Sequence, residues 1–186
     1  YTQKDTETDM DTARTLPVNV ALVKEFKLPQ SNIGSVVQLI VNFHADLIIC
    51  GTGNGSIICL DINNGHIVHK FVNVHFLPIC MLKMNAFKHH ELISCSNDAK
   101  LKCINLRDES IVDLPQIHQS SVVDVHFIRH PNRDQKLMIS VGIQDCIGIY
   151  DIARYQKLKI IDTKYSLTSV AWLNDRYLVF GDENGC

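Results

Sequence analysis

The sequence has no apolar run of the length that a membrane-spanning helix needs. Such a helix takes about 20 consecutive apolar residues, whereas the longest run here, Val36 to Val41, has the length of a strand and is interrupted by Gln38. We therefore predict no membrane span. With 186 residues, 46% of them hydrophobic, and a formal net charge of -2, the chain has the composition of a globular protein with a core.

Cysteine forms no metal-binding or redox pattern. The seven cysteines are scattered, no two are spaced as Cys-x-x-Cys, and most lie in apolar stretches where a thiol behaves as a small hydrophobic group. An odd number of cysteines without a disulfide framework is typical of proteins in reducing compartments. We therefore expect reduced thiols and a cytoplasmic or nuclear location.

Motifs for nucleotide or metal chemistry are missing as well. No Gly-Lys-Ser/Thr occurs, and Gly51 to Gly55 is followed by a predicted strand, whereas a phosphate-binding loop needs a helix N-terminus there. The nine histidines include three local pairs, none of them on a predicted helix that would align two imidazoles. These pairs are His66 and His69, His89 and His90, and His126 and His130. We predict no cofactor, no metal and no enzymatic activity.

Neither sign of charge is in excess. The first 16 residues hold two of the 18 Lys and Arg and four of the 20 Asp and Glu, which leaves 16 of each. No basic run carries interleaved aromatic residues, so the sequence gives no strong nucleic-acid signal. Residues 1–17 are polar, acidic and without periodicity, and we interpret them as a tail.

What the sequence does contain is a repeat of about 43 residues. Leu28-Pro29-Gln30 recurs as Leu114-Pro115-Gln116, an offset of 86 residues, or two units of 43. Between these copies, His75 precedes an apolar stretch in the same way as His118 does. A period of this length indicates an architecture built from repeated supersecondary units.

The unit that begins at His118 indicates what each repeat builds. Val123, Val125 and Phe127 alternate with polar residues, as in a strand with one buried face. Two more strands are predicted around Lys136 to Ser140 and Ile147 to Ile152, and a fourth, charged strand at Lys157 to Ile161 suits an exposed edge. The prediction is an all-β fold of four-stranded antiparallel meanders, the unit of a β-propeller.

From about residue 22 to residue 186, the units resemble the blades of WD-repeat β-propellers. That family's pattern is Gly-His before the first strand, a turn Asp between the second and third strands, and Trp-Asp at the end of the third. His75 and His118 occupy the His position and Asp98 the turn position, while Asp61, Asn105 and Asp151 occupy the last position. The chain departs from this pattern because no Trp precedes the last position. In addition, Asn32 and Thr163 replace the His, and Asn54 and Gln144 replace the turn Asp. In the family, these residues form a hydrogen-bonded brace within each blade.

The resemblance implies a division of the chain. Residues 18–35 would be a lead-in with a ring-closing strand, and residues 36–186 would form blades at 36–73, 78–114, 122–161 and, incompletely, 167–186. About three and a half blades make a partial ring, whereas closed propellers typically have about 4 to 8. We therefore expect that further residues supply the remaining blades, or that a partner covers the open ends.

The function that the resemblance implies is a non-catalytic scaffold for protein–protein interactions within a multi-subunit complex. One family contact face is formed by the loop before the first strand and the turn between the second and third. The residues predicted to bind partners there are His75, Phe76, Leu77, Lys100, His118, Gln119, Gln144 and Asp145. Phe76 and Leu77 are the best candidates for anchors, unless these two side chains pack between blades.

Two other functions fit a propeller. A reader of peptides or modified residues would need aromatic and acidic groups at the channel mouth, for which Phe76, Tyr165, Asp98 and Glu183 are the candidates. A propeller-based hydrolase would need a nucleophile beside His and a carboxylate. Ser120, His118 and Asp98 could be combined in this way, although the repeat explains each of them.

Overall fold

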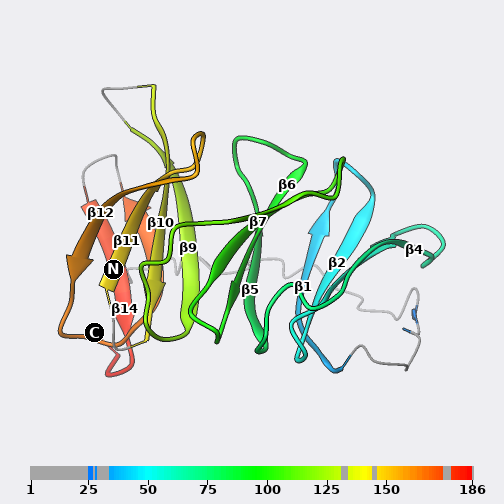
Figure 1. The fold of residues 1–186 in the computed structure, drawn as a ribbon, viewed down its shortest axis with the longest axis horizontal. Helices are drawn as coiled ribbons and strands as arrows, with labels where there is room; N and C mark the ends of the chain where they lie inside the picture. Colours follow the sequence, from blue (N-terminus) through cyan, green and yellow to red (C-terminus); the bar gives the residue numbers. More distant parts are fainter. Residues whose placement is uncertain are drawn as a thin grey trace, which may run out of the picture.

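The computed structural model describes residues 25–26, 28, 34–130, 134–143, 146–173 and 177–185. The regular elements in this part of the chain are all strands. They form three four-stranded antiparallel sheets and one two-stranded antiparallel sheet (Figure 1). Within each sheet, every strand pairs with the strand that follows it in the sequence. The predicted all-β fold of four-stranded antiparallel blades is confirmed.

The sheets follow one another along the chain, and we call them blades one to four. Blade one contains β1 (Val36–Asn42), β2 (Leu47–Thr52), β3 (Ile57–Asp61) and β4 (Ile67–Phe71). Blade two contains β5 (Ile79–Met84), β6 (Glu91–Ser96), β7 (Leu101–Asn105) and β8 (Ile111–Asp113). Blade three contains β9 (Val122–Arg129), β10 (Lys136–Gly142), β11 (Cys146–Asp151) and β12 (Gln156–Asp162), and blade four contains β13 (Leu167–Leu173) and β14 (Tyr177–Asp182).

The burial of each strand follows from its place in its blade. In the three complete blades, the second strands are covered on both faces: all six residues of β6 are buried, and only one residue each of β2 and β10 is not buried. By contrast, every residue of β12 is exposed, and its lysines Lys157 and Lys159 are typical of a strand that ends a sheet.

Hydrophobic cores lie between successive blades, which stand side by side in Figure 1. Ile49, Ile79 and Leu92 belong to the core between blades one and two. Ile93, Val125 and Tyr150 belong to the core between blades two and three, and Leu167 packs in the core between blades three and four. Each blade therefore depends on its neighbours for burial of its faces.

Polar contacts also join the first strands of successive blades. Gln38 Nε2 donates to the Cys80 carbonyl at 2.9 Å, and Lys83 Nζ donates to the Val125 carbonyl at 2.6 Å. Further on, the backbone N–H of Val170 donates to Asp124 at 2.8 Å. These contacts fix the position of each first strand against the next one.

Candidate partner-binding site

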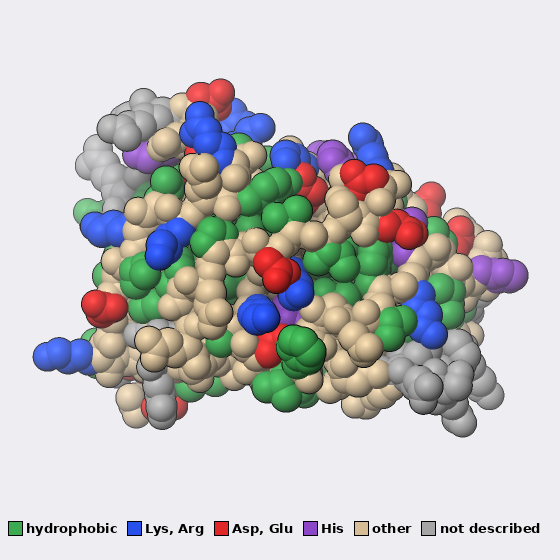
Figure 2. Space-filling view, viewed as in Figure 1, with side chains coloured by type: hydrophobic (Ala, Val, Ile, Leu, Met, Phe, Trp, Pro, Cys, Tyr) green, Lys and Arg blue, Asp and Glu red, His purple; other side chains and the backbone are tan. Residues whose placement is uncertain are grey.

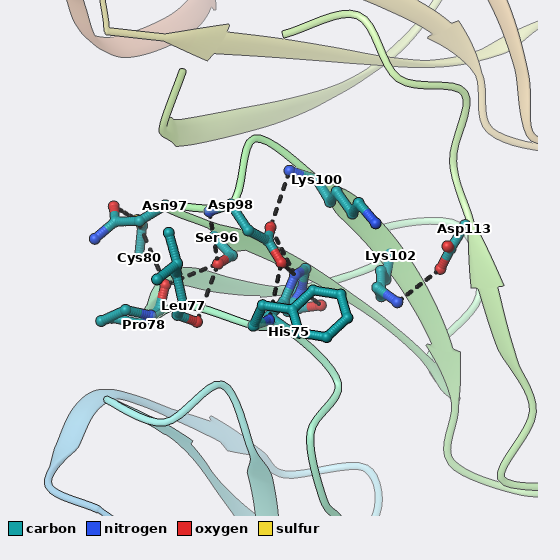
Figure 3. Close-up of polar contacts among 12 residues, drawn as sticks. His75, Leu77, Pro78, Cys80, Ser96, Asn97, Asp98, Lys100, Lys102 and Asp113 are labelled. Atoms are coloured by element: carbon teal, nitrogen blue, oxygen red, sulfur yellow. Dashed lines mark hydrogen bonds and ion pairs between the residues drawn. The ribbon is translucent and has the colours of Figure 1, made fainter. Parts of the chain in front are cut away.

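The best-defined surface feature among the predicted site residues is formed where the β4–β5 connection meets the β6–β7 turn (Figure 3). The connection carries His75, Phe76 and Leu77, and the turn carries Asp98 and Lys100. The backbone N–H of His75 donates to the Gly55 carbonyl of blade one at 3.0 Å. Gly55 has φ +78°, and a Cβ at this position would collide with the backbone of His75, so this close approach requires glycine.

A buried hydrogen-bonded brace lies beneath this connection. The imidazole of His75 contacts Asp98 through Nδ1 at 3.1 Å and Ser94 Oγ through Nε2 at 2.8 Å. Burial lowers the pKa of His75, although the Asp98 carboxylate opposes this effect. The imidazole is therefore neutral at pH 7, with Nδ1–H donating to Asp98 and Nε2 accepting from the Ser94 hydroxyl.

Asp98 holds the connection and the turn together. It accepts hydrogen bonds from the backbone N–H groups of Phe76 and Lys100, each at 3.1 Å. Burial by itself would raise the pKa of Asp98, but His75 and these N–H groups outweigh it and lower the pKa. The carboxylate is thus ionised at neutral pH and fixes the backbone on both sides of the site.

Phe76 and Leu77 project from this fixed backbone into solvent. Phe76 is 84% exposed and Leu77 is 47% exposed, so neither side chain is packed between blades. The ammonium group of Lys100 lies 5.6 Å from the centre of the Phe76 ring, which is cation–π distance. The carbonyl of Leu77 accepts a hydrogen bond from Ser96 Oγ at 3.1 Å, which fixes the backbone after the ring.

Lys102, next to this surface, is already paired. Its ammonium group lies 2.9 Å from the Asp113 carboxylate. Lys100 therefore remains as the basic group available beside the Phe76 ring. More widely, Figure 2 shows several separate groups of hydrophobic side chains on this side of the molecule, with acidic and basic side chains between them.

The remaining predicted contact residues do not join the surface around Phe76. His118 is buried and contacts Ser140 Oγ at 2.7 Å, as His75 contacts Ser94 in blade two. Gln119 is exposed on the connection before β9. Gln144 and Asp145 lie outside the described residues. The structure therefore brings together Phe76, Leu77 and Lys100 above a buried His75.

The last repeat position caps a turn in each complete blade. Asp61, Asn105 and Asp151 each accept a hydrogen bond through Oδ1 from the backbone N–H two residues further along the chain. The carboxylate of Asp151 also forms an ion pair with Arg154 at 2.9 Å. These three side chains stabilise the turn after the third strand and contribute nothing to the contact surface.

The brace has the order of groups of a serine hydrolase triad, with Ser94, His75 and Asp98 in hydrogen-bond contact. In a hydrolase, however, the nucleophile must reach its substrate, and the side chains of Ser94 and His75 are buried. The arrangement is therefore suited to holding a loop. Phe76 and Tyr165, the aromatic candidates for a peptide reader, lie on different connections, before β5 and before β13.

Sequence reasoning did not single out Ser94 and Ser96, which complete the site. Both are buried polar residues in an otherwise apolar strand, and both hydrogen-bond to the β4–β5 connection. Hydroxyl groups at alternate positions of a buried strand were the available signal, because such groups need partners.

The described residues contain neither a candidate membrane-spanning helix nor a candidate metal-binding cluster. No helix there has the length and apolar character of a membrane span. No group of three or more His, Cys, Asp or Glu side chains in the described ranges has the arrangement of a metal site.

Comparison with known proteins establishes the fold. No protein-family model and no curated protein sequence matches the chain. Among solved structures, the computationally designed Ika4 protein is similar with a TM-score of 0.68 and 20% identity, over 87% of this chain and 92% of that one. The WD40 β-propeller domain of Doa1 is similar with a TM-score of 0.68 and 18% identity, over 81% of this chain and 49% of that one.

A chain of the mitotic checkpoint complex is also similar, with a TM-score of 0.66 and 18% identity, over 79% of this chain and 45% of that one. The present chain therefore spans about half the length of the last two structures. At these identities, the likeness shows a WD40-like β-propeller fold and not a function.

Proposed function

We propose that this WD40-like chain is a non-catalytic scaffold that binds other proteins of a multi-subunit assembly, with Phe76, Leu77 and Lys100 as its contact surface. The observation that carries the proposal is the exposure of Phe76 above a fixed backbone. The backbone of an exposed loop residue would normally be mobile, but here the backbone N–H of Phe76 donates a hydrogen bond to Asp98. Such a preorganised anchor loses little conformational entropy when a partner covers it.

The chemistry of the surface indicates what kind of partner fits it. Aromatic anchors commonly dominate the binding energy of an interface when they fill a pocket on the partner. The Lys100 ammonium group beside the Phe76 ring favours a carboxylate at the edge of that pocket. We expect the partner to present an apolar pocket with an acidic rim.

A cytoplasmic or nuclear location fits this proposal. The six described cysteines are all free, and burial is the main cause that raises the pKa of the Cys59 and Cys103 thiols to about 12. Such thiols remain protonated and unreactive. We also propose that further blades or a partner cover the exposed faces of blades one and four.

The experiment compares two phenylalanines of similar exposure. Phe43, in the β1–β2 turn, is 79% exposed and lies at the opposite end of the strands from Phe76. Tagged full chain, Phe76→Ser and Phe43→Ser would each be expressed in cells, and the bound proteins would be quantified by mass spectrometry after mild cross-linking.

We expect the amounts of a specific set of bound proteins to fall at least about tenfold with Phe76→Ser. Phe43→Ser should bind the same proteins in wild-type amounts. Both variants should keep the thermal stability of the wild type, because neither ring is in a core. A set of bound proteins that is unchanged by Phe76→Ser, or equally reduced by Phe43→Ser, would contradict the proposed contact surface.

A further inference from the structure

A pocket lies between blades one and two. It has a volume of about 440 Å³ and is lined by the β1–β2 turn, by β4, by the β5–β6 connection and by the β7–β8 turn. In Figure 1, the β1–β2 and β5–β6 connections are at the upper edge of the sheets, away from the β4–β5 connection that carries Phe76. The pocket is therefore separate from the proposed contact surface.

Five basic side chains line this pocket, although they are dispersed in the sequence. They are His44, His69, His89, His90 and Arg107. The rings of His44, from blade one, and His89, from blade two, have centroids 4.3 Å apart and are tilted by 34° to each other. Leu47, Leu106 and Val68 supply an apolar part of the lining.

Two acidic residues near the pocket, Asp108 and Glu109, bind side chains other than that of Arg107. Asp108 accepts from Ser110 Oγ at 2.6 Å and from Asn105 Nδ2 at 2.9 Å. Glu109 lies 2.8 Å from His69 Nδ1. Within the described ranges, the guanidinium of Arg107 has no hydrogen-bond acceptor or ion-pair partner, although both acids follow it directly in sequence.

Three other charged residues lie around the pocket. Lys88, next to His89, is bound to Glu91 at 2.6 Å. Asp46, which follows the lining residue Ala45, and Lys70, which follows His69, are exposed charges of opposite sign. Among the described residues, the pocket thus offers one guanidinium and the imidazoles of His44, His89 and His90 with no carboxylate hydrogen-bonded to them, although the Asp108 carboxylate interacts electrostatically with His90.

We propose that this pocket binds a phosphate monoester group, carried by a phosphorylated protein side chain or present as free phosphate. A guanidinium binds two phosphate oxygens at once in a bidentate arrangement. The dianion also has a third terminal oxygen, which matches the additional imidazole donors better than the two oxygens of a carboxylate do. The apolar lining would contact the carbon atoms that carry the phosphate.

The test measures the affinity of the full chain for three probes by isothermal titration calorimetry. The probes are inorganic phosphate, a short phosphoserine peptide and the same peptide with unmodified serine. The variants are Arg107→Gln and, as a matched control, Arg129→Gln, an exposed arginine at the end of β9 in blade three. Urea denaturation of both variants verifies that they remain folded.

We expect at least one phosphate-bearing probe to bind at pH 6.5, with at least about tenfold weaker binding to Arg107→Gln and unchanged binding to Arg129→Gln. Binding of the phosphopeptide alone identifies the source as a protein, and equal binding of inorganic phosphate identifies it as the free anion. No binding of either phosphate probe would overturn the proposal. Binding that survives Arg107→Gln would overturn it as well.

Discussion

Asp98 contacts both the β4–β5 connection and the β6–β7 turn. It accepts from the backbone of Phe76 and of Lys100 and also contacts His75. The same carboxylate therefore orients the exposed ring and the basic side chain beside it. Its loss would affect stability and the contact surface together.

The pH dependence of stability should reveal this brace. The pKa values of His75 and Asp98 are both lowered on folding, so the unfolded chain binds more protons than the folded chain at acid pH. His75 therefore makes its full contribution to the free energy of unfolding above about pH 6.5, and this contribution decreases as the pH falls below that value. The contribution of Asp98 decreases below about pH 4. Urea denaturation should therefore show no loss from the brace between pH 8 and about pH 6.5, a first loss below about pH 6.5 from His75, and a further loss below about pH 4 from Asp98.

Asp98→Asn tests how much of this pH dependence comes from the Asp98 carboxylate. The amide keeps one acceptor oxygen but brings an NH₂ group against backbone donors, which should cost about 1–3 kcal/mol at pH 7. The difference between wild type and Asp98→Asn should narrow as pH falls towards 3.5, because the Asp98 carboxyl of the unfolded wild-type chain, which has the higher pKa, then begins to bind a proton. Asp134→Asn, at an exposed position, should follow the wild type; a constant difference at all pH values would refute the assignment to Asp98.

At the scale of elements, a polar cluster joins blade two to blade three. The buried carboxylate of Glu91, at the start of β6, accepts from Lys88 Nζ at 2.6 Å, Tyr155 Oη at 2.7 Å and Asn85 Nδ2 at 2.9 Å. Burial by itself would raise the pKa of Glu91, but these donors outweigh it and lower the pKa. Tyr155 comes from the β11–β12 turn, so its hydroxyl fixes one blade against the next.

Removing that hydroxyl should weaken the junction. Tyr155→Phe leaves the ring in place but takes one donor from a buried carboxylate, and we expect a loss of about 1–3 kcal/mol in the free energy of unfolding, measured with urea. Tyr165→Phe removes a hydroxyl from an exposed ring and should change the free energy little. Equal effects of the two substitutions would show that the Glu91 cluster contributes nothing to the junction.

These contacts show how far the sequence predicted the structure. Alternation in Val123, Val125 and Phe127 predicted β9 because a strand's burial period is local, and repetition then predicted its counterparts. Tyr155 and Glu91 are 64 residues apart, and no local pattern indicates that they meet. Likewise, His44, His89 and Arg107 look like unrelated loop residues until blade packing brings their turns together.

At the scale of the whole molecule, each blade covers the face of the one that follows it. The fourth residue of the first strand is Leu82 in blade two, Val125 in blade three and Val170 in blade four, and these are 3%, 0% and 5% exposed. Leu39 is the same position in blade one and is 56% exposed. The difference between Leu39 and Leu82 is therefore due to the neighbouring sheet and not to the residue, which is leucine in both.

Two identical substitutions test this dependence on neighbours. Leu82→Ala removes buried methyl groups and leaves a cavity between blades one and two, which should cost about 2–5 kcal/mol in the free energy of unfolding. Leu39→Ala removes the same groups from an exposed face and should cost less than about 1 kcal/mol. Leu39→Lys should likewise leave the chain folded, whereas Leu82→Lys should unfold it, because it buries an unpaired charge. If Leu39→Ala proved as costly as Leu82→Ala in urea denaturation, the face of blade one would have to be covered in solution.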